Sequence, residues 1–136
     1  MLEQPLVLIG WSLGGYIARE IARDKPNIVS QVITMGTPVI GGSKYTATGE
    51  GFIKEGMDID WIANELPKRD KVKIQAPITA IYGKYDGCIA QEACIDTINP
   101  HVHHIEVNTC HMGFGFHYPT WQLILNKLAH QAPETD

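Results

Sequence analysis

The pattern of hydrophobic and polar positions changes its period along the chain, and each change predicts a new element. Residues 5–9 (Pro-Leu-Val-Leu-Ile) form a short apolar run that ends at Gly10, which is typical of a strand buried on both faces. From Gly14 to Pro26 apolar residues recur at helical spacing, which predicts an amphipathic helix of about three turns. Its apolar face is expected to consist of Ile17, Ala18, Ile21 and Ala22, and its polar face of Arg19, Glu20, Arg23 and Asp24.

Three more strands and a last helix follow. Runs rich in β-branched residues at 29–35 and 77–82 each stop at a glycine, and a weaker strand is expected at 103–107. Pro119 lies near the start of the final helix, which we expect to pack on the sheet. Its apolar positions are Trp121, Ile124, Leu125 and Leu128.

The long stretch from Val39 to Gln75 is expected to form a lid-like excursion over the active-site end, with one short helix at 58–66. Strands that alternate with helices or long connections predict a single α/β domain covering residues 1–136, with an open, mostly parallel sheet of about four strands and flanking helices. In such sheets, functional sites collect at the carboxyl ends of the strands.

Composition narrows the classes of function. The chain has 136 residues, 44% of them hydrophobic, and a formal charge of -4, so nothing in its charge points to nucleic acid or an anionic membrane. No apolar run is long enough to span a bilayer, and the N-terminus lacks the basic start of a secretion signal, so we expect a cytoplasmic protein. Three cysteines are too few for a disulfide framework, but a single Cys88–Cys94 bridge stays open.

A candidate nucleophile lies directly after the first strand. Residues 10–14 (Gly-Trp-Ser-Leu-Gly) match the G-x-S-x-G pattern of a nucleophile elbow, which needs a buried strand, a strained serine, small neighbours and a helix that begins at once. Gly10 and Gly14 are expected to meet the steric need, Gly15 to supply further room where the helix starts, and the amide of Leu13 to donate to an oxyanion. The alternative is that Ser12 only caps the helix.

A nucleophilic serine needs a base, and the base needs an orienting acid. Asp86 follows the third strand, where a loop can carry an acid to a histidine. The alternative is that Asp86 and Gly87 merely form a turn. Asp58 and Asp60 compete as the acid, but their place before an apolar helix favours capping.

Six histidines compete for the role of base. Four of them lie within eleven positions: His101, His103, His104 and His111. We favour His111, because it follows the fourth strand in a loop just before the last helix. His117 ranks next, and His130 is expected at a helix end or exposed. A metal site among the clustered histidines lacks a recognisable ligand spacing, and Cys110 lacks the surroundings of an activated thiol.

Taken together, these motifs resemble the α/β-hydrolase superfamily, in particular its bacterial lipase- and esterase-like members. The resemblance rests on the elbow at 10–15, on Ile-Thr-Met-Gly-Thr-Pro at 33–38, on Tyr-Gly-Lys-Tyr-Asp-Gly at 82–87 and on His-Met-Gly at 111–113. It implies a Ser12, Asp86 and His111 triad that hydrolyses carboxylic esters without a cofactor. Acyl transfer to an acceptor other than water would use the same residues.

The apolar residues of the excursion suggest a hydrophobic acyl or alcohol group in the substrate, although they could equally cover the sheet. They are Val39, Ile40, Phe52, Ile53, Met57, Trp61 and Ile62.

The resemblance covers only the C-terminal half of the family's fold, because family members have several strands and helices before the elbow strand. The missing part would include the loop that donates the second oxyanion amide in the family. The elbow strand would also become an open edge, so we expect a homodimer or pairing with a complementing N-terminal half. The competing hypothesis is a catalytically weak or inactive fragment that self-associates.

Overall fold

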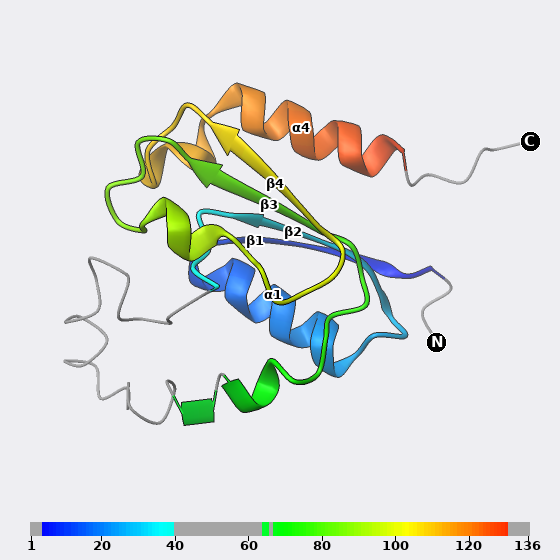
Figure 1. Ribbon diagram of the computed structural model, residues 1–136. Coiled ribbons are helices and arrows are strands. Elements are labelled where there is room, and N and C mark those ends of the chain that lie inside the picture. The colour runs from blue at the N-terminus through cyan, green and yellow to red at the C-terminus, as the bar shows by residue number, and fades with distance from the viewer. Residues whose placement is uncertain (1–3, 40–63, 66, 131–136) are drawn as a thin grey trace, which may run out of the picture.

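The computed structural model describes residues 4–39, 64–65 and 67–130 (Figure 1). Four strands form one sheet in the order β1-β2-β3-β4, and every neighbouring pair is parallel. The strands are β1 (Leu6–Trp11), β2 (Val29–Met35), β3 (Ile78–Gly83) and β4 (Val102–Val107). The predicted parallel α/β sheet of about four strands is therefore confirmed.

Two helices of 12 residues cover opposite faces of this sheet (Figure 1). They are α1 (Leu13–Asp24) and α4 (Tyr118–Ala129), both at the positions that the hydrophobic pattern predicts. Two short 3-10 helices, η2 (Gln91–Cys94) and η3 (Met112–Gly115), lie in the loops that follow β3 and β4. Most of the expected short helix at 58–66 lies outside the described residues, although residues 64–65 and 67–69 are helical.

The core consists of one apolar cluster on each face of the sheet. Under α1 the buried members are Ala18, Ala22, Val29, Val32, Ile74, Ala76 and Ile78. Under α4 they are Ile33, Met35, Ile81, Val107, Phe114 and Ile124. Neighbouring β2 residues Val32 and Ile33 belong to different clusters, as the alternation of side chains along a strand requires. Both faces of the central strands β2 and β3 are therefore covered by apolar side chains, which explains their largely apolar sequences.

The expected faces of the two helices were partly wrong. In α1 the isoleucines Ile17 and Ile21 are 50% and 41% exposed, whereas Arg19 and Arg23 are buried beside Ala18. In α4, Ile124 is buried as expected, but Leu125 is 61% exposed. The arginines are buried because distant segments provide ionic partners for them, and hydrophobic periodicity contains no information about such partners.

Arg19 forms an ion pair inside the protein. Its Nη2 lies 2.7 Å from Asp96 Oδ2, and both side chains are almost completely buried. Asp96 also accepts hydrogen bonds from the amides of Ile98 and Asn99 and from the Asn99 side chain. Burial alone would raise the pKa of Asp96, but the Arg19 charge and these hydrogen bonds outweigh it and hold the pKa below 3.8. This network ties α1 to the loop before β4.

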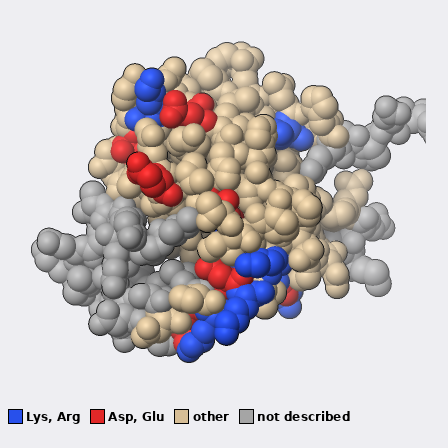
Figure 2. Space-filling view, viewed as in Figure 1, with Lys and Arg blue, Asp and Glu red and all other residues tan. Residues whose placement is uncertain are grey.

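Arg23 attaches the segment before β3 to the far end of α1. Its guanidinium donates to Asp70 and to the carbonyl oxygens of Arg69 and Val72. Arg69 in turn pairs with Glu20 and Asp24. Figure 2 shows Lys, Arg, Asp and Glu side chains gathered along the lower edge, where Figure 1 places α1 and the segment before β3, and a smaller charged group at the upper left. The described end of the excursion thus packs on α1, and its central part lies outside the described residues.

Within the described ranges, no helix is long and apolar enough to cross a membrane.

We predict that Arg19→Met destabilises the fold by about 3–5 kcal/mol at neutral pH, because it leaves the Asp96 carboxylate buried without its partner. The difference in unfolding free energy between the wild type and the variant should become smaller as the pH falls below about 4. In the wild type the lowered pKa of Asp96 stabilises the fold above the unfolded-state pKa, and this stabilisation is lost on acidification. In the variant, burial of Asp96 without the arginine favours its protonated form, so the folded state gains stability, relative to neutral pH, as the pH falls. Urea unfolding at several pH values measures both effects, and a pH-independent difference would contradict the assignment.

Candidate active site

Ser12 occupies the turn between β1 and α1 in an unusual backbone conformation. Its φ is 52° and its ψ is -121°, and it is the only non-glycine with a positive φ among the residues described. Such a conformation costs on the order of 1–3 kcal/mol and persists only where the surroundings enforce it. The Ser12 amide donates to the Met35 carbonyl at 2.8 Å, and Thr37 Oγ1 donates to the Ser12 carbonyl at 3.0 Å. Two hydrogen bonds to the β2 end therefore fix the turn.

Two glycines give the turn its room. A Cβ on Gly10 would lie 2.4 Å from backbone atoms of Gly14 and Gly15, and one on Gly15 would lie 2.0 Å from Thr37 Oγ1. At Gly14, by contrast, a Cβ would meet nothing within 4 Å among the described residues. The structure thus agrees with the expectation for Gly10 and Gly15, whereas the expectation for Gly14 was wrong, because Gly15 is the residue that faces Thr37.

The Ser12 side chain is not a helix cap. It stands at the N-cap position of α1 but makes no capping hydrogen bond. Leu13 is the first residue of α1, so its amide has no acceptor within the helix and lies at the positive end of the helix dipole. A negatively charged oxygen next to Ser12 could accept from this amide.

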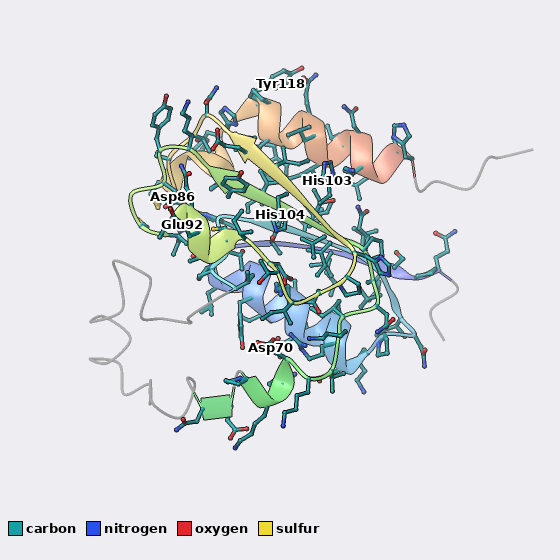
Figure 3. The ribbon with its side chains drawn as sticks, in the orientation of Figure 1. Asp70, Asp86, Glu92, His103, His104 and Tyr118 are labelled. Atoms are coloured by element: carbon teal, nitrogen blue, oxygen red, sulfur yellow. The ribbon has the colours of Figure 1, made fainter. Side chains whose placement is uncertain are left out.

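Asp86 serves a turn and a histidine at the same time. Its Oδ1 accepts from the amides of Cys88 and Ile89, both at 2.9 Å, which fixes the loop after β3. Its Oδ2 lies 2.8 Å from His111 Nδ1. Asp86 therefore fixes its own turn through Oδ1 and contacts His111 through Oδ2. Figure 3 shows Asp86 in this loop, beside η2.

His111 directly precedes η3 and is 9% exposed. Because the buried Asp86 carboxylate accepts hydrogen bonds, the contact places the ring proton of neutral His111 on Nδ1 and leaves the Nε2 lone pair free. The imidazole also packs against aromatic rings: its centroid lies 5.7 Å from that of Trp11 and 6.5 Å from that of Phe114.

The structure joins Asp86 to His111 directly and places Ser12 at the same carboxyl edge of the sheet. Trp11, which contacts His111, is the residue before Ser12. In the described part of the chain the Ser12 hydroxyl makes no hydrogen bond to His111, and such contacts often tighten only when substrate binds. Gly36, at φ +53°, lies against the pair: a Cβ there would be 3.0 Å from Asp86 Oδ2 and 3.1 Å from His111 Nδ1.

The other candidate residues have different roles or lie outside the described ranges. His117 Nδ1 bonds Thr120 Oγ1 at the start of α4, and His130 ends that helix. His103 and His104 lie on opposite faces of β4 (Figure 3), near Lys127 and bonded to the Asp96 amide, respectively. Asp58 and Asp60 are not among the described residues.

No group of three or more His, Cys, Asp or Glu side chains that could hold a metal ion occurs in the described portion of the chain. The three cysteines are free, so Cys88 and Cys94 are not bridged. Burial, with a smaller contribution from the Asp86 charge, raises the pKa of Cys94 to about 12. That thiol therefore stays protonated and is a poor nucleophile.

The described strands and helices have the fold of the corresponding part of solved α/β-hydrolase structures. Similar solved structures include alpha/beta hydrolase domain-containing protein 10 from mouse, at 16% identity and a TM-score of 0.64, covering 96% of this chain and 62% of that one. An alpha-beta serine hydrolase homologue from Coxiella burnetii matches at 20% identity and a TM-score of 0.61, and the match covers 91% of this chain and 49% of that one. The Pyrococcus furiosus esterase Pf2001 matches at 15% identity and a TM-score of 0.65, and the match covers 94% of this chain and 54% of that one.

The chain thus spans about half to two-thirds of the length of these structures. No protein-family model and no curated protein matches it. At these identities the likeness concerns the fold, in which Ser12, Asp86 and His111 each follow a strand at its carboxyl end.

We predict that Gly10→Ala destabilises the protein by about 1–3 kcal/mol or more, because the new methyl group would collide with the backbone of α1. Gly14→Ala is the matched control and should stabilise the helix by up to about 1 kcal/mol, since its Cβ meets open space. The midpoints of urea unfolding compare the two variants. Equal midpoints would show that the close approach at Gly10 does not constrain the elbow.

Proposed function

We propose that the chain carries the nucleophile, base and acid of a serine hydrolase that acts on carboxylic esters. The proposal rests on two observations at the carboxyl edge of the sheet: Ser12 is strained, and its neighbour Trp11 contacts His111, whose Nδ1 lies 2.8 Å from Asp86 Oδ2. Strain in a serine that caps nothing is costly, and sites of function are where such strain is retained. An imidazole with a fixed tautomer and a free Nε2 is what a serine needs as a general base.

In the proposed reaction, His111 Nε2 removes the Ser12 proton as Oγ attacks the ester carbonyl carbon. The carbonyl oxygen becomes an oxyanion next to the Leu13 amide, and the Asp86 carboxylate stabilises the imidazolium. When the tetrahedral intermediate collapses, the ester C–O bond breaks and His111 returns the proton to the leaving alcohol. Water then attacks the acyl-enzyme with help from the same base, which releases the acid and restores Ser12.

The oxyanion site needs a second donor, and none is identified among the described residues. Loss of one such donor typically reduces transition-state stabilisation by about 2.7–4 kcal/mol. In the α/β-hydrolase superfamily, which the chain resembles, this donor comes from a loop before the elbow strand. The rate of turnover therefore depends on a donor beyond those described, whereas the reactivity of Ser12 toward a phosphorylating reagent depends mainly on the residues named above.

The proposed substrate is a hydrophobic ester. Among the similar structures are an esterase and a thioesterase domain from the curacin biosynthetic pathway, which supports acyl chemistry. Exposed apolar side chains lie near the histidine loop, including Met112 at 65% and Phe116 at 92% exposed. The apolar residues 40–62 that suggested the same substrate lie outside the described ranges.

A second candidate function is that of a subunit whose sheet is completed by another chain. In β1 the amides of Leu6 and Ser12 point toward β2, so the period of a strand directs those of Val7, Ile9 and Trp11 to the opposite edge. Within the described sheet β1 is an edge strand. Exposed apolar side chains flank that edge: Leu6, Ile9, Trp11, Leu13, Ile17 and Ile21. Such an edge is a template for pairing, and in a preparation of this chain alone we propose a second copy as the occupant.

We predict that a fluorophosphonate probe labels the chain at Ser12 and that Ser12→Ala abolishes the reaction. Asp86→Asn should slow labelling by about 10³-fold or more, because an amide nitrogen in place of Oδ2 favours the wrong tautomer of His111. The asparagine can keep the Oδ1 acceptor for the turn, so stability should change little. Mass spectrometry of the labelled peptide gives the site and the rate. A wild-type chain that does not react, or reacts equally as Ser12→Ala, would refute the hydrolase proposal.

The pairing of β1 predicts a dimer in light scattering coupled to size exclusion. Ile9→Lys should yield a monomer, since a charge beside the open edge opposes strand addition. Val72→Lys is the matched control: Val72 is 59% exposed and lies on the segment that packs against α1, so this variant should remain a dimer. A monodisperse wild-type monomer would exclude self-association through this edge.

A further inference from the structure

Trp11 links the elbow to the histidine. It is the last residue of β1, directly before Ser12, and its ring lies 5.7 Å from the His111 ring at an interplanar angle of 42°. Val7 packs in the cluster beneath α4 and Leu8 in the cluster beneath α1. The alternation of a strand therefore puts Trp11 on the α4 side, where the histidine loop lies. This contact joins the first and fourth strands of the sheet at their carboxyl ends.

His111 is confined by Trp11 together with two other groups. Phe114, which is fully buried, meets the imidazole edge to face at 87°. Asp86 holds Nδ1 at 2.8 Å. The carboxylate fixes one atom of the ring, and the two aromatic side chains restrict rotation about that hydrogen bond. Together they leave little freedom in where Nε2 points.

The Trp11 ring also lies within cation–π range of the charge that the proposed reaction places on His111, since the two ring centroids are 5.7 Å apart. The face of an indole carries negative potential and attracts a cation within about 6 Å of its centroid, more strongly than tyrosine or phenylalanine does. Asp86 is the charged group that contacts the ring. The residue before His111 in the chain, Cys110, carries a free, exposed thiol.

We propose that Trp11 is a positioning residue, which orients His111 toward Ser12 and stabilises its imidazolium form. The inference rests on the proposed hydrolase function and deepens it, since it adds a second stabilising partner beside Asp86. It assigns a role to the residue directly before the proposed nucleophile. Because Trp11 is 38% exposed, its large ring contributes less to the hydrophobic core than a buried tryptophan would, and the contact with His111 is its distinguishing feature.

The test compares Trp11→Leu, which removes the aromatic face, with Trp11→Phe, which keeps a weaker one. Trp121→Leu is the control: this tryptophan is also 38% exposed, but it lies on α4 and bonds Gly115 instead of contacting the histidine. Thermal unfolding identifies any variant that does not fold. The first measurement is the NMR signal of the His111 ring, assigned with His111→Asn, at the pH where half of the wild-type ring is protonated.

At that pH, Trp11→Leu should lower the protonated fraction from one half to roughly one third or less, because a cation–π contact contributes a factor of about 2–30 in equilibrium terms. The protonated fraction of Trp11→Phe should lie between those of the wild type and Trp11→Leu, and that of Trp121→Leu should equal the wild-type value. With a p-nitrophenyl ester, kcat of Trp11→Leu should drop roughly 2- to 30-fold while KM stays within about twofold, since the lost contact acts mainly on the imidazolium that forms in the reaction.

An unchanged protonated fraction in folded Trp11→Leu would overturn the inference, and so would an equal change in Trp121→Leu. A rise in KM with unchanged kcat would overturn it as well, because Trp11 would then act on substrate binding. The NMR measurement does not require catalysis. Suppose that Ser12 fails to react with fluorophosphonate while Trp11→Leu still lowers the protonated fraction of His111. The hydrolase proposal then fails, and so does the role of Trp11 in positioning a base. The effect of the Trp11 contact on His111 protonation would still stand.

Discussion

The site depends on how closely α1 approaches β1 at Gly10. A Cβ at that position would penetrate the backbone of Gly14 and Gly15, so only glycine lets the helix begin immediately after the strand. The short connection forces Ser12 into its positive φ, and Thr37 and Met35 at the end of β2 hold it there. The strain is local, while the restraint comes from the neighbouring strand. Pairing of β1 with β2 is therefore a condition for the conformation of the candidate nucleophile.

The parallel sheet then determines which loops can meet. All four strands end at the same edge, so the turn after β1, the loop after β3 and the loop after β4 are neighbours although they are far apart in sequence. Asp86 connects two of these loops by dividing its oxygens between its own turn and His111. Gly36 leaves space for the pair at the end of β2. Each of the four strand ends thus contributes a residue to one site.

The features that could be predicted from the sequence are those encoded by local patterns. Apolar runs and turn residues gave the four strands and both long helices, and the elbow motif together with the order of elements pointed to Ser12, Asp86 and His111. Features that depend on distant partners were missed. Arg19 was placed on the polar face of the helix because nothing local reveals its distant partner Asp96, and the contact of Gly15 with Thr37 could not be predicted because Thr37 lies in the segment after another strand. Trp11 and Gly36 were not identified as site residues for the same reason.

Trp11 also connects the site to the β1 edge of the described sheet. Its amide belongs to the set that points away from β2, while its ring packs on His111. A strand added along β1 would restrain the backbone of Trp11 and, through it, the orientation of the ring. Under the two proposals, completion of the sheet and orientation of His111 are coupled through one residue. This coupling reconciles the two candidate functions, since a chain that associates through β1 would order the contact that holds His111 in place, and a subunit role and a catalytic role would support each other.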